Sequence, residues 1–312
     1  MILVCGEALF DVFAMADTST GLTLDARVGG SPFNVAVGLS RLAQPVSFLS
    51  AISSGFLGER LIRALQTEGV NTRTVQRTNA PTTLSLVGVD AHGVPSYSFY
   101  GQGAADRLLT AQALDVLPLG VRAIHVGSYA TVAGPTAVTQ RALVARAHAD
   151  AGAHTLIAYD PNIRLNVEPL LGIWRDQIQW MLPRTHLLKV SDEDLALVYP
   201  GQGLGEFAAQ ALAQGVACVV VTRGGQGAMA WSAQGAVENA PVAVDVVDTV
   251  GAGDTFQAAL LTWLAENDAL SAPALGTLSI DALGQALGFA ARAAAITCSR
   301  RGADLPRRAE LP

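Results

Sequence analysis

The sequence predicts one α/β domain, in which helices cover both faces of a mostly parallel β-sheet and a small β appendage comes from the N-terminal third. From about residue 110 onward, strand-like and helix-like segments alternate, as they do in a parallel sheet with helical crossovers. Before that point, two β-rich runs flank a turn-forming segment. The 312 residues are 50% hydrophobic and only 15% charged, so the chain can bury a core of this size.

The N-terminal third begins with an apolar β-type run at Met1–Cys5. The pattern predicts helices over Asn34–Leu42 and Gly58–Glu68, the second closed by Gly69 as a C-cap. Further strands are expected at Ser47–Ala51, Thr83–Val89 and Ser96–Tyr100. Residues 90–95 separate the last two runs and carry a hairpin signal, and both runs mix polar and apolar residues as an exposed sheet would.

The second part of the chain supplies the parallel sheet and its helices. The expected strands are Ala123–Gly127, Thr155–Tyr159, His186–Val190 and Ala217–Thr222. The expected helices are Thr136–Ala151, Asp192–Tyr199, Glu206–Gln214, Ala252–Glu266 and Ile280–Thr297. Because each strand is followed by a helix, the strands are expected to run parallel and to be buried on both faces.

Charge and composition exclude several classes of protein. The 26 acidic residues outnumber the 20 basic ones, whereas binding nucleic acid needs clustered cations. Glu7, Asp11 and Arg292 interrupt the apolar segments near the two ends, so no stretch reaches the roughly 18 uncharged residues of a membrane span. The three cysteines lie far apart in apolar contexts and no signal-peptide pattern is visible. We therefore expect a cytoplasmic protein with no nucleic-acid or membrane partner.

The strongest chemical signal is the string Asp248-Thr249-Val250-Gly251-Ala252-Gly253-Asp254-Thr255-Phe256, which leads directly into an apolar helical segment. Its glycines and the free N–H groups of a starting helix would form an anion hole for a phosphoryl group. Asp254 would lie in the first helical turn and could accept a proton from an attacking hydroxyl group. A bare Gly-x-Gly-Asp is more often a tight turn before an ordinary helix-terminal acid, but the whole nine-residue string favours the functional interpretation.

This string resembles the C-terminal signature of the ribokinase-like (PfkB) carbohydrate kinase family. The segment Gly29–Ala36, about 220 residues earlier, is similar to the N-terminal signature of that family. Further stretches resemble its fructokinase branch, namely Gly6–Asp11, Phe99-Tyr100 followed by Ala104–Asp106, and Asp160–Arg164. The stretch Thr297–Ala303 also fits the family, whereas residues 100–103 lack the arginine that many fructokinase relatives place there. The resemblance covers essentially the full length. It implies one ribokinase-like three-layer α/β/α domain over residues 1–312, with a small β-sheet lid near residues 11–30 and 83–102.

The resemblance also implies roles on the acceptor side of the site. Asp254 would be the catalytic base, and the anion hole would consist of Gly251, Ala252 and Gly253. Sugar hydroxyl groups would be held by Asp11, Gly29, Gly30 and Asn34, because a carboxylate and a carboxamide accept and donate in fixed geometry and a glycine pair lets the sugar approach the backbone. Arg164 would reach the acceptor from the carboxyl end of a strand. On the lid, Tyr97 and Phe99 would either face the sugar or pack the lid onto itself.

The nucleotide side is implied by two other stretches. The glycine-rich turn after the strand ending at Thr222 lacks the spacing of a dinucleotide fingerprint and alone would be a hairpin turn. By resemblance it is an ATP loop that includes Thr222, Gly224, Gly225 and Gly227. The stretch Lys189–Asp194 matches a segment near magnesium and phosphate in the family. It places Ser191 and Asp194 where relatives usually carry Asn and Glu, so contact with Mg²⁺ is expected through water.

Two further features concern adenine and a second cation. Residues 288–295 lack the asparagine that many relatives place near adenine, so adenine would be held by shape and apolar contact. Many relatives bind a monovalent cation beside the anion hole. Asp248, Val250 and Gly302 stand in the matching places, so stimulation by K⁺ is a hypothesis for this chain.

The resemblance implies an ATP- and Mg²⁺-dependent sugar kinase that phosphorylates a primary hydroxyl group, with D-fructose converted to fructose 6-phosphate as the first hypothesis. A 2-keto-3-deoxygluconate kinase is the main alternative, although its substrate carboxylate would favour a further cation beside Arg164. From a different class, a catalytically silent sugar-binding regulator on the same fold would be expected to have lost Asp254 or the glycines. The mixed polarity of residues 83–100 also permits a homodimer through the lid.

Overall fold

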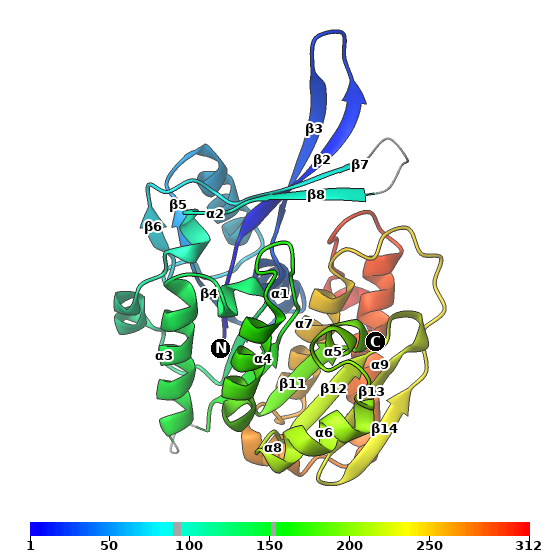
Figure 1. Ribbon diagram of the computed structural model, residues 1–312. Coiled ribbons are helices and arrows are strands. Elements are labelled where there is room, and N and C mark those ends of the chain that lie inside the picture. The colour runs from blue at the N-terminus through cyan, green and yellow to red at the C-terminus, as the bar shows by residue number, and fades with distance from the viewer. Residues whose placement is uncertain (90–94, 151–153) are drawn as a thin grey trace.

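A central sheet of eight strands organises the computed structural model, which describes residues 1–89, 95–150 and 154–312 (Figure 1). The strand order is β14-β13-β12-β11-β10-β9-β1-β4. The six strands from β12 to β4 are parallel, and β13 and β14 are antiparallel at one edge. Their bounds are β1 Ile2–Cys5, β4 Val46–Leu49, β9 Ala123–Gly127, β10 Leu156–Asp160, β11 Leu187–Ser191, β12 Cys218–Thr222, β13 Ala228–Ser232 and β14 Gly235–Asn239.

Helices pack on both faces of this sheet and enclose two apolar clusters. One cluster lies under α1 (Ser31–Arg41), α2 (Phe56–Thr67), α7 (Ala252–Glu266), α8 (Ala272–Gly276) and α9 (Ile280–Cys298). The other lies under α3 (Thr136–Ala149), α4 (Leu171–Met181), α5 (Asp192–Val198) and α6 (Leu204–Ala213). In β1, Ile2 and Val4 belong to the first cluster and Leu3 to the second. This alternation buries the sheet on both sides, as expected for parallel strands.

A smaller sheet projects from the body above the carboxyl ends of the parallel strands (Figure 1). Its strands, in the order β3-β2-β7-β8, are β3 Leu22–Gly29, β2 Leu9–Asp17, β7 Leu84–Val89 and β8 Pro95–Tyr100. The β2–β3 and β7–β8 pairs are antiparallel, and β2 and β7 are parallel. The four strands correspond to the two segments predicted to form a lid.

The remaining elements are short. Strands β5 (Ala51–Ser53) and β6 (Gln76–Thr78) form a parallel pair beside the main sheet. Short 3₁₀ helices occur at Ala105–Arg107, Ala111–Val116, Tyr129–Thr131, Leu182–Arg184, Gly224–Gln226 and Arg308–Glu310. No helix of the described residues combines the length and apolar character that crossing a bilayer requires.

Most predicted elements are confirmed within one to three residues, and the differences have local causes. Helix α1 starts at Ser31 rather than Asn34, because Pro32 needs no hydrogen-bonded N–H in the first turn and Gly30 serves as N-cap. The run predicted at 47–51 splits into β4 and β5, which belong to different sheets. Helix α3 ends at Ala149, short of Ala151, which lies outside the described residues.

Several elements were not predicted as such. Strands β2 and β3 were assigned only to a lid segment, and β13, β14, α4 and α8 were missed. In α4, the buried positions Trp174, Gln177, Ile178 and Met181 follow helical spacing, so a periodicity signal was present. The predicted β7–β8 hairpin is confirmed by its antiparallel pairing, although its turn, residues 90–94, lies outside the described residues.

A buried ion pair joins the neighbouring strands β10 and β11 of the main sheet. Lys189 Nζ of β11 lies 2.6 Å from Asp160 Oδ2 of β10, and the two side chains are 6% and 3% exposed. Removing one member of such a pair leaves the other charge buried without compensation, which typically costs several kcal/mol.

Replacing Lys189 with Met is therefore expected to lower the free energy of unfolding by about 3–5 kcal/mol, because Asp160 would stay buried without its cation. Urea denaturation at neutral pH measures this difference. The matched control is Arg122→Met, which removes an exposed pair with Asp268 at 3.9 Å and is expected to cost less than about 1 kcal/mol. Equal losses in the two variants would show that burial of the Lys189 pair does not matter.

Candidate active site

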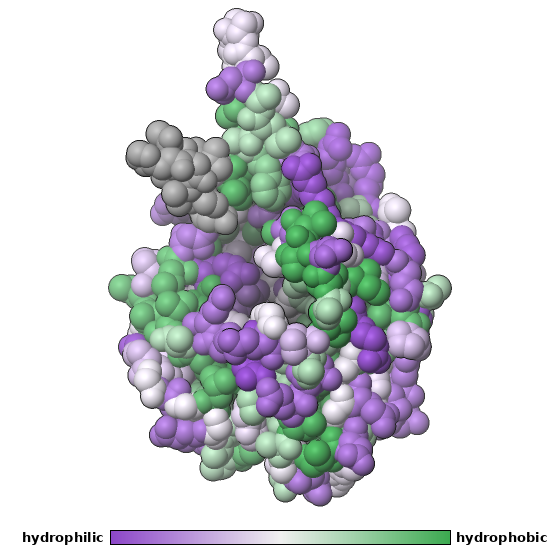
Figure 2. All heavy atoms as spheres, turned by 90° about the vertical axis from the view of Figure 1, so that its right-hand side faces the viewer, coloured by the Kyte–Doolittle hydropathy of each residue, from purple (hydrophilic) through white to green (hydrophobic). Residues whose placement is uncertain are grey.

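A cavity of about 380 Å³ lies between the small sheet and the carboxyl ends of β1, β9 and β10. Figure 2 shows a hollow in the surface below the projecting hairpin. Open α/β sheets bind ligands at this edge, because the loops that follow the strands converge there. Nine of the predicted site residues line the cavity, namely Asp11, Gly30, Asn34, Phe99, Arg164, Val250, Gly251, Gly253 and Asp254.

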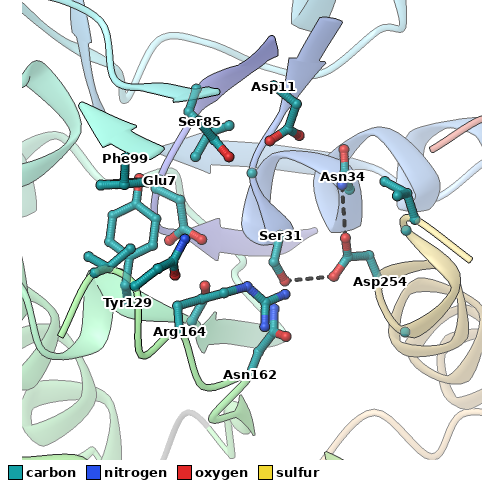
Figure 3. A pocket seen from close by; sticks show the side chains of 18 of the residues that line it. Glu7, Asp11, Ser31, Asn34, Ser85, Phe99, Tyr129, Asn162, Arg164 and Asp254 are labelled. Carbon is teal, nitrogen blue, oxygen red and sulfur yellow. Dashed lines mark hydrogen bonds between the residues drawn. The ribbon is translucent and has the colours of Figure 1, made fainter. Parts of the chain in front are cut away.

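The Asp254 carboxyl group is held from both sides by α1. Its Oδ1 accepts a hydrogen bond from Ser31 Oγ at 2.6 Å, and its Oδ2 accepts one from Asn34 Nδ2 at 2.8 Å (Figure 3). Burial raises the pKa of Asp254 above its ordinary value, while these two hydrogen bonds and the positive charges of Lys189 and Arg164 act in the opposite direction. The result is a buried carboxyl group with a fixed orientation at the cavity wall.

The predicted anion hole surrounds the first turn of α7. Gly251 is the N-cap in the left-handed conformation (φ 78°), and a Cβ there would lie 2.7 Å from the Cβ of Ala303, so this position requires glycine. The N–H of Ala252 already donates to Thr249 O at 3.2 Å, so this amide is less available for a ligand than the sequence prediction assumes. A Cβ on Gly253 would lie 3.2 Å from Lys189 Nζ, which places a buried positive charge next to this turn.

The β2–β3 hairpin places Asp11 and the glycine pair at the cavity. A Cβ on Gly29 would lie 2.4 Å from Asp11 Oδ2, so the missing side chain leaves room for this carboxyl group. Gly30 has φ 105°, and a Cβ there would lie 2.9 Å from the carbonyl oxygen of Glu7. Burial raises the pKa of Asp11, which the Ser85 hydroxyl group and the Arg164 charge partly oppose. Gly29 itself lies beside the cavity rather than in its lining.

Arg164 and Phe99 also line the cavity. Arg164 follows β10, and its Nη1 donates to Ile163 O at 2.9 Å. The ring of Phe99 packs edge-to-face on Tyr129 with centroids 5.3 Å apart, so Phe99 both lines the cavity and fixes the strand to the body. The side chain of Tyr97 lies outside the described residues.

The predicted nucleotide-binding residues form a separate group outside this cavity. Thr222, Gly224, Gly225 and Gly227 lie at the turn that joins β12 to the antiparallel strand β13. Lys189 is engaged with Asp160, and Ser191 caps α5 by accepting a hydrogen bond from the N–H of Asp194 at 3.0 Å.

Asp194 lies between these two groups. Its Oδ1 accepts a hydrogen bond from the N–H of Ile163 at 3.3 Å. Burial, and then the nearby negative charge of Asp160, raise the pKa of Asp194 to about 6. Asp160 Oδ1 is also buried and has no hydrogen-bond partner among the described residues. Two close carboxyl groups offer the hard oxygen ligands that Mg²⁺ prefers.

The predicted cation loop is assembled around Asp248. Its Oδ1 accepts a hydrogen bond from the N–H of Val250 at 3.0 Å, and its Oδ2 accepts one from the N–H of Gly302 at 2.8 Å. One carboxylate thus joins two loops that are distant in sequence. Among the described residues, no group of three or more His, Cys, Asp or Glu side chains could hold a metal ion.

The cavity also contains residues to which the sequence gave no role. The main ones are Glu7, Ser31, Ser85, Ser128, Tyr129, Asn162, Asn166 and Thr249. Ser128 and Asn162 follow β9 and β10 with positive φ values of 55° and 40°, a strained conformation that is enriched at functional sites. Asn162 lies in the Asp160–Arg164 motif and Ser31 follows the glycine pair, so both could have been identified from the sequence. Ser128 and Tyr129 carried no such signal.

Comparisons with known proteins agree with this arrangement. A family model described as pfkB family carbohydrate kinase matches residues 1–309. A fructokinase of Rhizobium leguminosarum bv. trifolii is 33% identical over 283 residues, which cover 91% of this chain and 85% of that protein. Probable fructokinase-4 of Arabidopsis thaliana is 30% identical, with coverage of 100% and 95%. The structure of Xylella fastidiosa fructokinase with bound ATP has a TM-score of 0.85 at 26% identity, covering 100% of this chain and 94% of that one. The ribokinase-like fold predicted from the sequence is confirmed.

Proposed function

Because the chain belongs to the pfkB family of carbohydrate kinases, we propose that it transfers the γ-phosphoryl group of ATP to the 6-hydroxyl group of D-fructose. Membership makes it a phosphotransferase with an alcohol acceptor. The observation that carries the proposal is the Asp254 carboxyl group, which Ser31 and Asn34 hold at the wall of a sugar-sized cavity. The fructokinase names of relatives that are 30–33% identical support fructose as the acceptor.

In the proposed reaction, Asp254 takes the proton from the 6-hydroxyl group. The sugar oxygen forms a bond to the γ-phosphorus while the bond to the β-phosphate oxygen breaks, and ADP leaves with the electron pair of that bond. The hydrogen bonds from Ser31 and Asn34 keep the carboxyl group oriented toward the cavity. A fixed orientation of this kind lowers the activation barrier, because the entropic cost of aligning the reacting atoms is already met in the folded protein.

Charge on the transferring phosphoryl group would be stabilised at the start of α7. The backbone around Gly251 and Gly253 is uncovered by side chains, and the first amides of a helix lack partners within the helix. The buried Lys189 ammonium group next to Gly253 adds a positive charge behind this turn. Stabilisation of this type acts most strongly in a site from which water is excluded.

ATP would approach along the β12–β13 turn, with its phosphates pointing toward α7. Mg²⁺, when bound, supplies charge neutralisation on the phosphates. Asp194, with Ser191 beside it, would contact the ion through water, which suits the carboxyl pair formed by Asp194 and Asp160. A monovalent cation would bind the loop around Asp248, whose carboxylate already fixes Val250 and Gly302 in one arrangement.

The charges of the cavity favour a neutral sugar over a sugar acid. Among the described residues that line it, Glu7, Asp11 and Asp254 carry carboxyl groups and Arg164 is the one cation. A keto-acid substrate would bring a further carboxylate next to Asp11 and Asp254 in the same cavity. Like charges at short distance are repelled strongly where water is excluded, so fructose fits better than 2-keto-3-deoxygluconate.

The small sheet would act as a lid and as a dimer contact. Its projecting hairpin exposes Met15, Leu22 and Leu24 at about half of their surface, and Figure 2 shows this hairpin standing clear of the body. Exposed apolar side chains gathered on one projection are typical of a contact with a second molecule. Light scattering is expected to give the mass of a homodimer at micromolar concentration, and a monomer mass would contradict this contact.

The three free cysteines and the use of ATP support a cytoplasmic location.

Replacing Asp254 with Ala is expected to lower kcat by about 10²–10⁴-fold and to change sugar binding little, because only proton transfer is lost. A coupled ADP-release assay measures kcat, and isothermal titration calorimetry measures sugar affinity. The matched control is Asp281→Ala, which removes an exposed acid from the first turn of α9 and leaves the cavity intact. Near-normal turnover of the Asp254 variant would contradict its assignment as the base.

The acceptor is identified by the same assay with ATP and Mg²⁺ on a panel of fructose, 2-keto-3-deoxygluconate, ribose, glucose, tagatose and adenosine. Fructose is expected to give the highest kcat/KM, and K⁺ is expected to increase it. A preference for the keto acid would overturn the substrate but not the reaction. Silence on every acceptor, in a folded protein that binds ATP, would favour a regulatory sugar-binding protein.

A further inference from the structure

Glu7 is a buried acid in the cavity wall that the proposed chemistry does not use. It follows β1, it is 1% exposed, and it lines the cavity. Its Oε2 is fully buried and has no hydrogen-bond partner among the described residues. In Figure 3, its carboxyl group lies on the opposite side of the cavity from Asp254. Glu7 therefore holds an unpaired oxygen within the cavity wall, on the side remote from the proposed base.

The neighbouring acid shows what a structural carboxyl group looks like in this fold. Asp106 is 2% exposed, and both of its oxygens are used, since Thr83 donates to Oδ1 and Tyr129 donates to Oδ2 at 2.7 Å. Asp106 does not line the cavity. An unsatisfied buried polar group costs about 1–3 kcal/mol, so the unpaired oxygen of Glu7 needs a partner that the described residues do not supply.

We propose that Glu7 is a specificity-determining residue, whose unpaired oxygen hydrogen-bonds the hydroxyl groups at the end of the sugar remote from the one that is phosphorylated. This inference rests on the proposed function, because Asp254 defines the phosphorylated end. For fructose phosphorylated at C6, the remote groups are the hydroxyl groups on C1 and C2. A sugar that lacks them leaves Glu7 unsatisfied, and a site built to pair such a group rejects the analogue without it.

The surroundings of Glu7 favour its uncharged form. Burial raises the pKa of Glu7 to about 8, the Ser128 hydroxyl group lowers it, Asp106 raises it, and Arg164 lowers it. Tyr129 and the buried Cys5 thiol also face this carboxyl group, and both have raised pKa values. At neutral pH, Glu7 is therefore mostly protonated, with one donor and one acceptor to offer a sugar hydroxyl group. Glutamine offers the same pair, so Glu7→Gln is the conservative variant.

The test is a cycle between variants and substrate analogues. The substrates are D-fructose, 1-deoxy-D-fructose and 2,5-anhydro-D-mannitol, which lack the C1 and C2 hydroxyl groups in turn, with D-tagatose as the control altered at C4. Wild type, Glu7→Ala and Glu7→Gln are compared at pH 7. Glu7→Ala is expected to raise KM for fructose by about 10- to 100-fold with kcat nearly unchanged, because one buried hydrogen bond is lost. Glu7→Gln is expected to stay within about threefold of wild type.

The decisive readout is the dependence on the analogue. In wild type, at least one of the two remote-end analogues is expected to show the same rise in KM as Glu7→Ala shows for fructose. The KM for that analogue is expected to be the same in Glu7→Ala as in wild type, because the hydrogen bond between Glu7 and the missing hydroxyl group is already absent. The KM for tagatose is expected to rise in Glu7→Ala as the KM for fructose does.

Asp106→Asn is the matched control, because it changes a buried acid of the same cluster outside the cavity. It is expected to lower the melting temperature and to leave the ratio of fructose to analogue KM unchanged. A Glu7→Ala variant that lowers the melting temperature in the same way, with that ratio unchanged, would overturn the proposal. Increases in KM that add up when the Glu7→Ala variant is combined with the analogue would overturn it as well. Calorimetric binding of an ATP analogue verifies that each variant is folded.

Failure of the substrate assignment gives a different result. If wild type ignores fructose and phosphorylates another sugar of the panel, the fructose proposal fails by itself. The same cycle is then run with that sugar and its analogue deoxygenated at the remote end. If the effects of the Glu7 substitution and of the missing hydroxyl group on KM are not additive, the role of Glu7 is supported. If the two effects are additive, it is refuted.

Discussion

The Asp254 carboxyl group and the two side chains that hold it are the contact on which the site depends. Ser31 and Asn34 belong to α1, and Asp254 belongs to α7, more than 200 residues later. The two helices begin at the same edge of the sheet, so one buried carboxyl group joins the N-terminal and C-terminal signatures. Without this contact, the carboxyl group that we propose as the base would lose its fixed orientation at the cavity.

Around this contact, the protein tolerates an unusual density of buried acids. The pKa values of Glu7, Asp11, Asp106 and Asp254 are all raised, and burial is the largest cause in each case. Desolvated carboxyl groups destabilise a fold unless hydrogen bonds or cations compensate them. Side chains of Thr83 and Tyr129 donate to Asp106, and those of Ser31 and Asn34 donate to Asp254, whereas no described residue donates to Oε2 of Glu7. This difference distinguishes Asp106, which stabilises the fold, from Glu7, which we propose binds the sugar.

Much of the fold was predictable because its signals are local. The strand–helix alternation fixed the parallel sheet, and the helix at Ala252–Glu266 was predicted with its observed bounds, since glycine ends the preceding loop and apolar periodicity follows. What the sequence missed depends on contacts across the fold. The role of Ser31 appears only when α1 meets α7, and the unpaired state of Glu7 appears only when β1, β9 and the small sheet enclose it. No local pattern marks a hydrogen bond that is missing.

The two sides of the proposed reaction are built differently, and this has a consequence for selectivity. The proposed acceptor side consists of oriented side chains that line a cavity, with the carboxyl groups of Glu7 and Asp254 on opposite sides of it. The proposed nucleotide side includes the glycine turn at Gly224–Gln226, where a Cβ on Gly224 or Gly225 would meet no heavy atom within 4 Å. Side chains in an enclosed site discriminate between ligands because each unpaired group is costly, whereas exposed backbone accepts any phosphate of suitable shape. With the proposed assignment of the two sites, discrimination between substrates therefore falls on the sugar rather than on the nucleotide.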